Sequence, residues 1–115
     1  IRFVFSHGGG TVTSVVERLL RLERSAKDGG ALLPRGVLYE LRKFHYDLAL
    51  TAHPVPVTAL LKLVPVSQVL YGTDYPFWDG RKVTTGLVKG GVSGADLLAI
   101  DRDNALRLFP MAGRA

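Results

Sequence analysis

Hydrophobic and polar residues follow several different spacings along this chain. Three short stretches are rich in β-branched and aromatic residues and are flanked by turn-forming residues. Such stretches are typical of short β-strands. We therefore predict strands over Arg2–Ser6 (RFVFS), Phe44–Leu50 (FHYDLAL) and Gln68–Thr73 (QVLYGT).

The segment after the first predicted strand has helical spacing. Its apolar residues would form one face of a helix, at Val12, Val15, Val16, Leu19 and Leu22. Ser14 and Glu17 have the spacing of a capping box near its start. We expect this helix to end before the sequence KDGG at 27–30, because paired glycines favour a turn.

Further helices are predicted along the rest of the chain. A helical turn is expected over Val37–Arg42, and a helix over Val55–Val64 is entered through HPVP, since proline fits a first helical turn. The last helix is expected from Ser93, which has capping-box spacing to Asp96, to about Phe109. Its buried side would consist of Leu97, Leu98, Ile100, Ala105, Leu108 and Phe109.

This order of strand, helix, strand, helix, strand, helix is the signature of parallel βαβ units with right-handed crossovers. Three parallel strands are few for an independent α/β domain, because both faces and both edges of such a sheet must be covered. The first predicted strand opens the chain, and Ile1 stands where an initiator methionine is usual. We therefore expect the chain to be part of a larger sheet.

Composition narrows the classes of function. The chain has 115 residues, of which 47% are hydrophobic, which suits the core of one domain. It has no cysteine, so disulfides, thiolate catalysis and cysteine-based metal sites are excluded, and a cytoplasmic location is expected. The longest apolar stretch is interrupted by Lys62 and by prolines, so we expect no membrane partner.

The net charge of +5 comes from 15 lysines and arginines that are spread singly along the chain. The sequence has no block of like charges and no basic strip interleaved with aromatic residues. We interpret the charge as a solvated basic surface and expect no nucleic-acid partner.

Residues that could carry out chemistry follow the first and third predicted strands, in the sequences SHGGG and GTDYPF. Functional groups of parallel α/β proteins gather at the carboxyl ends of strands, so His7 and Asp74 are expected on the same side of the sheet. Taken singly, HGGG is a tight turn whose glycines permit positive φ. Asp74 is either an Asx-turn former or a metal ligand or general base.

Three known glycine-rich motifs do not match the sequence around HGGG. The chain lacks the third glycine of the dinucleotide-binding fingerprint, and it lacks the Gly-Lys-Ser/Thr ending of the phosphate-binding loop. The lipase oxyanion hole lacks its G-x-S-x-G partner, since the nearest approach, GVSGA, ends in Ala95.

The motifs taken together resemble a known family. FSHGGG, LRKFHYDLAL, QVLYGTDYPF and GVSGADLLAIDRDNALRLF follow one another as in the C-terminal portion of the metal-dependent amidohydrolases that include aminocarboxymuconate-semialdehyde decarboxylase and γ-resorcylate decarboxylase. The resemblance implies a (β/α)₈ TIM barrel. The three strands would be its sixth, seventh and eighth, and residues 1–115 would be the C-terminal part of one barrel domain.

The resemblance also implies a function. The complete protein would be a nonoxidative decarboxylase or a hydrolase of a small carboxylated, cyclic or aromatic substrate. It would hold one divalent metal ion, zinc first, with manganese or magnesium as alternatives. His7 would be the catalytic acid/base, and Asp74 would act in catalysis and as metal ligand. A neutral imidazole near a metal-bound water can exchange protons close to physiological pH.

Other residues receive weaker assignments. By the resemblance, Arg18 would bind a substrate carboxylate across the interface of a homodimer, although a solvated helix position explains it equally. Phe77, with Tyr75 and Trp78, would wall the substrate pocket. Asp47 is expected to stabilise the end of the barrel, and His45, two residues earlier on the same face of the strand, is interpreted as structural.

The sequence also departs from the family pattern. The family's H-x-H or E-x-H pair and its fifth-strand histidine are missing, and the three histidines present, His7, His45 and His53, form no such pair. We therefore expect the isolated chain to be inactive. His53 lies in a loop that would approach the site. Two rivals remain: a noncatalytic α/β module that binds an anion at the glycine-rich turn and helix N-terminus, and an interaction domain that uses basic helix faces.

Overall fold

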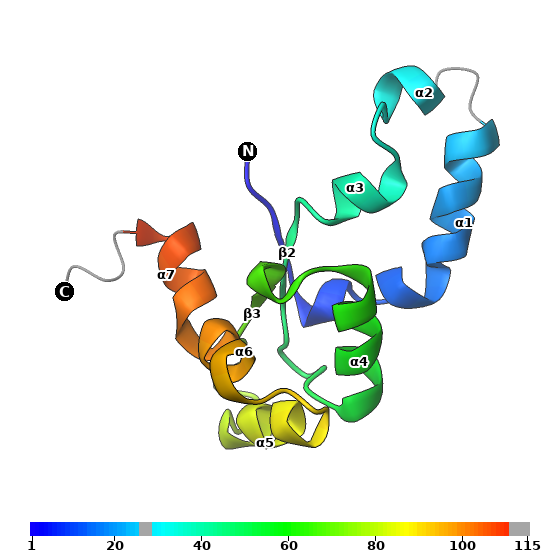
Figure 1. The fold of residues 1–115 in the computed structure, drawn as a ribbon. Coiled ribbons are helices and arrows are strands. Elements are labelled where there is room, and N and C mark those ends of the chain that lie inside the picture. The colour runs from blue at the N-terminus through cyan, green and yellow to red at the C-terminus, as the bar shows by residue number, and fades with distance from the viewer. Residues whose placement is uncertain (26–28, 111–115) are drawn as a thin grey trace.

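The computed structural model describes residues 1–25 and 29–110. Its centre is a parallel sheet of three strands in the order β1-β2-β3, which confirms the predicted α/β class (Figure 1). The strands are shorter than the stretches that predicted them and lie inside these stretches. They are β1 (Val4–Phe5), β2 (His45–Asp47) and β3 (Val69–Leu70).

The register of the sheet decides which side chains share a face. Phe5 pairs with Tyr46, and Tyr46 pairs with Val69, so these three side chains point to the same face. His45 and Asp47 alternate with Tyr46 and point to the other face. Tyr46 and Val69 are each 1% exposed, so the Tyr46 face carries the core.

The described residues form the helices α1 (Val12–Ser25), α2 (Gly29–Leu32), α3 (Val37–Leu41), α4 (Pro54–Leu63), α5 (Arg81–Lys89), α6 (Gly94–Leu98) and α7 (Asn104–Leu108). Side chains of α1, α3, α4, α5 and α6 pack into or against the core, whereas α2 contacts α1. Short 3₁₀ turns, η1 (His7–Gly9) and η2 (Val66–Gln68), follow β1 and precede β3, and a π-helical segment, η3 (Ala99–Asp103), joins α6 to α7. The buried core runs through the sheet, α4, α5 and η3, and consists of Tyr46, Leu48, Val57, Leu60, Leu63, Val64, Val69, Val83, Leu87, Val92 and Ile100.

Helix α5 was missed by the sequence patterns. Its sequence, RKVTTGLVK, contains two threonines and a glycine, which are weak helix formers. Tertiary packing favours it instead, because Val83 and Leu87 are buried in the core. Gly86 sits so close to the loop between β2 and α4 that a Cβ on it would lie 1.7 Å from the carbonyl oxygen of Ala52.

The two predicted capping boxes differ from the structure. Helix α1 begins two residues before Ser14, and the N–H groups of Ser14 and Val15 both donate to the carbonyl of Thr11, so the Ser14–Glu17 capping box is wrong. The last helical segment does begin after Ser93, as predicted, but the Ser93 side chain makes no capping hydrogen bond.

The buried side predicted for the last helix is partly wrong. Ile100 and Leu108 are buried, but Leu98 and Phe109 are 50% and 54% exposed. Leu97 packs against the core. Successive side chains of a helix are turned by about 100°, so Leu98 points away from the core and toward solvent. Phe109 lies beyond the last helical residue, with φ −122° and ψ 74°, so helical spacing no longer applies to it.

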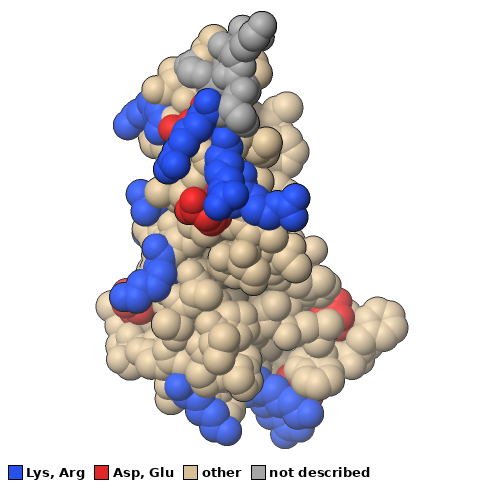
Figure 2. Space-filling model, turned by 90° about the vertical axis from the view of Figure 1, so that its right-hand side faces the viewer, with Lys and Arg blue, Asp and Glu red and all other residues tan. Residues whose placement is uncertain are grey.

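Charged side chains gather in groups on the face shown in Figure 2. Several lysine and arginine side chains lie side by side in the upper part of that view, with acidic side chains among them, and others lie near its lower edge beyond uncharged surface. None of the helices formed by the described residues combines the length and apolar character that a membrane span requires.

Candidate active site

Polar groups gather at one edge of the sheet. Because the strands are parallel, the residues that leave their carboxyl ends emerge at the same edge. His7 follows β1, Asp47 ends β2, and Asp74 follows β3, so the structure agrees with the predicted placement of His7 and Asp74. Asp47 stands between them in the strand order.

The same edge concentrates unusual backbone. His7, Leu50 and Asp74 have φ of 54°, 56° and 60°, and among the described residues they are the non-glycine residues with positive φ. Each one follows a different strand. Left-handed backbone is unfavourable for side chains with a Cβ and is often found at functional sites.

The glycines after His7 are needed for close packing. At Gly9 a Cβ would lie 2.9 Å from ring carbons of Tyr46, and at Gly8 it would lie 3.2 Å from the hydroxyl of Thr51. Both glycines also have positive φ. The turn can therefore press against β2 and the loop behind it, which brings His7 to the edge of the sheet.

His7 is held at both its backbone and its ring. Its N–H donates to Oδ1 of Asp47 over 3.1 Å, and its ring Nδ1 lies 2.9 Å from the carbonyl oxygen of Ala49. The N–H of Ala49 donates to the same Asp47 oxygen over 3.0 Å. The half-buried imidazole therefore has a fixed orientation.

The carboxylate of Asp74 makes no hydrogen bond or ion pair with the described residues. In the turn that begins here, the N–H of Tyr75 donates to the hydroxyl of Thr73 over 3.1 Å, and the N–H of Phe77 donates to the backbone carbonyl of Asp74 over 2.9 Å. The side-chain bond of an Asx turn is thus made by Thr73 instead. Asp74 is half-buried and lies ahead of the cis Tyr75–Pro76 bond.

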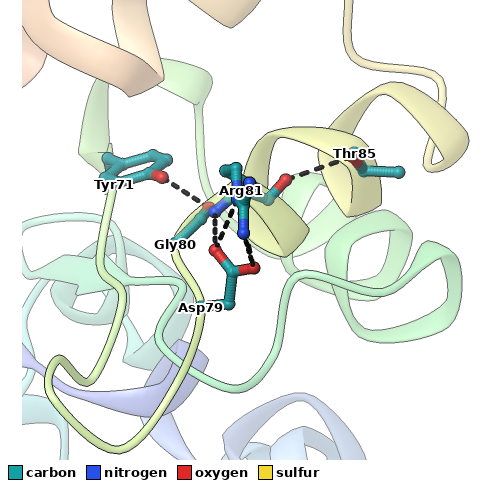
Figure 3. A network of polar contacts seen from close by, with 5 residues as sticks. All are labelled: Tyr71, Asp79, Gly80, Arg81 and Thr85. Carbon is teal, nitrogen blue, oxygen red and sulfur yellow. Dashed lines mark hydrogen bonds and ion pairs between the residues drawn. The ribbon is translucent and has the colours of Figure 1, made fainter.

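A polar network ties down the far end of the loop after Asp74 (Figure 3). The hydroxyl of Tyr71 donates to the carbonyl of Gly80 over 2.7 Å. Arg81 binds both carboxylate oxygens of Asp79, and this contact lowers the pKa of Asp79 and raises that of Arg81. The hydroxyl of Thr85 donates to the carbonyl of Arg81. The loop is therefore anchored to the start of α5.

The residues assigned to substrate binding do not meet in one cavity. Phe77 and Tyr75 are 83% and 84% exposed on the loop after Asp74. Arg18 is exposed on α1, where it lines a surface hollow of about 340 Å³ with Val15, Leu19 and Leu22. Trp78 lines a different cavity, of about 220 Å³, where Lys82 lies 4.5 Å from its ring centroid.

The two other histidines differ from His7. His53 is exposed, and its Nδ1 accepts the N–H of Val55 over 3.5 Å, which caps α4. His45 has a buried Nδ1 with no hydrogen-bond partner. Burial lowers the pKa of His45, and the positive charge of Arg2 lowers it further.

The donor groups at this edge supply only part of a metal site. Among residues 1–25 and 29–110, no group of three or more histidine or acidic side chains comes together. Of the two aspartates at this edge in the described part of the chain, Asp47 accepts two N–H groups and Asp74 has a carboxylate that accepts no hydrogen bond. Carboxylate oxygen and imidazole nitrogen are ligands that suit manganese and zinc.

Sequence reasoning assigned Asp47 only a general stabilising role. The alternation of β2 did place Asp47 on the right face, but nothing local indicated that its carboxylate binds a backbone group 40 positions earlier. Ala49 gave no signal, because it contributes through its backbone.

Comparison with known proteins identifies the relatives of this chain. The family described as Amidohydrolase matches residues 1–111. The chain belongs to this family. Among curated amidohydrolase relatives, the decarboxylase yanB of Aspergillus niger is 30% identical over an alignment 117 residues long. The alignment covers 96% of this chain and 32% of that protein. The 6-methylsalicylic acid decarboxylase acuB of Aspergillus aculeatus is 26% identical, over 99% of this chain and 37% of that protein.

Solved structures of the amidohydrolase fold agree. A dihydroxybenzoic acid decarboxylase from Polaromonas sp. JS666, with bound manganese and the inhibitor 2-nitroresorcinol, superposes with a TM-score of 0.76 at 16% identity. The match covers 96% of this chain and 34% of that one. The chain thus spans about a third of the length of the relatives that it matches.

Proposed function

We propose that this chain forms part of the active site of a metal-dependent, nonoxidative decarboxylase of small aromatic carboxylic acids. Residues 1–115 would be the C-terminal three βα units of one barrel domain in the complete protein. One observation carries the proposal: an oriented imidazole, His7, and a carboxylate without described partners, Asp74, leave parallel strands at the same edge of the sheet. Membership of the amidohydrolase family supports it.

The metal would be held in part by Asp74. Its carboxylate fits one ligand position, and the remaining ligands would come from outside the described residues, which hold no cluster of three donors. A divalent cation there would polarise substrate oxygens and lower the pKa of a bound water. We propose one such ion, with zinc expected from the resemblance and manganese from the Polaromonas relative.

His7 would supply the proton of the reaction. In its doubly protonated form His7 would deliver the Nε2 proton to the ring carbon that carries the carboxylate, where a C–H bond would form. The imidazole would be left neutral, with its remaining proton on Nδ1. The bond from that carbon to the carboxylate carbon then breaks and CO₂ leaves. The electron pair of the broken bond returns to the ring, so no oxidant or reductant is needed. A fixed general acid of this kind contributes roughly 10²- to 10⁴-fold to a rate.

The loop after Asp74 would cover the substrate. Phe77 is exposed and lies three residues from Asp74, so we propose that it provides apolar surface for the aromatic ring. Arg18, exposed on α1, would bind the substrate carboxylate of a second copy in a homodimer. These two assignments follow the family resemblance.

The rival noncatalytic function fits the turn less well. An anion-binding turn needs backbone N–H groups that point outward. Here the N–H groups of His7, Gly9 and Gly10 donate to Asp47, Ser6 and His7 respectively.

Hydrolysis would use the same side chains as decarboxylation, and the names of the curated relatives favour decarboxylation.

Metal content and CO₂ release together test the proposal. The full-length protein that contains this sequence is loaded with manganese or zinc and supplied with 6-methylsalicylate or a dihydroxybenzoate. Asp74→Asn is expected to lose most of the bound metal. His7→Ala should keep the metal but lose at least about 100-fold in CO₂ release.

Two controls sharpen this test. His53→Ala alters an exposed helix-capping histidine and should leave both readings unchanged. Full metal retention in Asp74→Asn, or unaltered CO₂ release in His7→Ala, would contradict the assigned roles. Metal-loaded protein that releases no CO₂ from any of these acids would contradict the function itself.

A further inference from the structure

One oxygen atom organises the surroundings of His7. Oδ1 of Asp47 accepts the N–H of His7 over 3.1 Å and the N–H of Ala49 over 3.0 Å. The ring Nδ1 of His7 lies 2.9 Å from the carbonyl oxygen of the same Ala49. The imidazole contact is therefore anchored at both ends to a single carboxylate oxygen, through the backbone of His7 at one end and of Ala49 at the other.

The partner of the ring decides where the proton of a neutral imidazole lies. A carbonyl oxygen accepts hydrogen bonds but cannot donate one. The Nδ1 contact is a hydrogen bond only when Nδ1 carries the proton, which leaves the lone pair on Nε2. We infer that Asp47 is a positioning residue that fixes His7 as the Nδ1–H tautomer and leaves Nε2 as the nitrogen that exchanges protons with a ligand.

Packing against β3 keeps the Asp47 carboxylate in place. Gly72 follows β3 two residues before Asp74, and a Cβ at Gly72 would lie 2.9 Å from Oδ1 of Asp47 and 3.0 Å from the N–H nitrogen of Ala49. There is no room for a side chain there. Asp47 thus lies between the turn that carries His7 and the segment that leads to Asp74, and it contacts both.

Asp47 acts here as a hydrogen-bond acceptor, so two substitutions of it should differ in effect. Asp47→Asn keeps an oxygen that can accept both N–H groups and so should keep the tautomer. Asp47→Ala removes the acceptor and releases both backbone segments. Gly72→Ala leaves Asp47 intact but displaces its carboxylate, so it is a second, independent way to disturb the same arrangement.

Nitrogen-15 NMR of histidine-labelled full-length protein measures the tautomer directly, without metal or substrate. Signals are assigned by single His→Gln variants. At a pH where the rings are neutral, wild-type protein should show protonated Nδ1 and unprotonated Nε2 for His7. Asp47→Asn should match it, and Asp47→Ala and Gly72→Ala should show a mixture that includes the Nε2–H form.

Several outcomes would overturn the inference. One is a wild-type His7 in the Nε2–H form, which is measured on the wild-type protein itself and so cannot be confused with misfolding of an Asp47 or Gly72 variant. Another is an unchanged tautomer in folded Asp47→Ala. His53 is the internal reference, since its ring caps α4 and should keep its signals in every Asp47 and Gly72 variant.

Kinetics supply a second readout that rests on the proposed function. In the metal-loaded protein, Asp47→Ala should lower kcat by about 10- to 100-fold with little change in KM, and Asp47→Asn should restore most of it. Absence of decarboxylation in wild-type protein would sink the proposed function and leave the tautomer result standing. Active protein with the wrong tautomer would sink the inference and leave the function standing.

Discussion

At the scale of single residues, backbone strain and chemistry coincide. His7 and Asp74 both have positive φ, and both follow a strand at the edge where the candidate site lies. A side chain in this conformation costs about 1 to 3 kcal/mol, so the surrounding contacts must hold it there. For His7 these contacts are the two hydrogen bonds to Asp47 and Ala49.

His45 predicts a pH dependence of stability at the same scale. Burial and Arg2 lower its pKa in the folded protein below the ordinary value of 6.5, so the unfolded chain binds more protons. The stability associated with a neutral His45 ring is fully present above pH 6.5, the pKa of the unfolded chain. It is lost as the pH falls from there through the lower pKa of the folded protein. We expect the free energy of unfolding, from urea titrations, to decrease from about pH 7 to pH 5.

The matched variant is His45→Gln, which removes the titrating group and should flatten this slope. His53→Gln, which alters an exposed histidine, should keep the slope of the wild type. An equal slope in His45→Gln would show that His45 does not cause the effect.

At the scale of elements, a buried amide joins the last helix to the sheet. Asn104 at the start of α7 is 1% exposed, and its Nδ2 donates to the carbonyls of Val66 and Val69 over 2.8 and 2.7 Å. Its Oδ1 accepts a hydrogen bond from Arg107. These bonds satisfy carbonyls at the entry to β3, the strand that leads to Asp74.

Asn104→Ala should therefore destabilise the protein. It removes the Asn104 donor from the buried carbonyl of Val69. The carbonyl of Val66 keeps the N–H of Val69 as a donor. We therefore expect a loss of about 1 to 3 kcal/mol. Thermal or urea unfolding measures it. Arg102→Ala, on the exposed surface of the preceding π-helical segment, should change stability by less than about 0.5 kcal/mol. Equal losses in the two variants would contradict a specific role for Asn104.

At the scale of the whole molecule, we propose that the described residues hold only part of a site, with Asp74 as one metal ligand and His7 as the proton carrier. No cluster of three donors forms among the described residues. The chain covers about a third of its curated relatives. The fold places these groups at a sheet edge, and we propose that further strands complete the ligand set.

The 115-residue chain alone should consequently bind manganese weakly and release no CO₂ from 6-methylsalicylate. Full-length protein should bind about one equivalent, and a chelator should abolish its activity while its circular dichroism stays unchanged. Tight stoichiometric binding by the 115-residue chain would show that its own side chains suffice.

The sequence by itself determined that the strands are parallel, most of the helices, and the edge of the sheet at which His7 and Asp74 emerge. The strands and helices follow from local spacing, because burial on one face imposes a period on the residues nearby. The shared edge follows from the parallel strands. Helix α5 escaped this reasoning, since its residues are weak helix formers that the core holds in place. The tertiary structure also decided the partners. Thr73 makes the turn hydrogen bond that one of the two interpretations of Asp74 gave to Asp74, and Asp47 binds His7. Partners 40 residues apart depend on how strands pack, which no local pattern encodes.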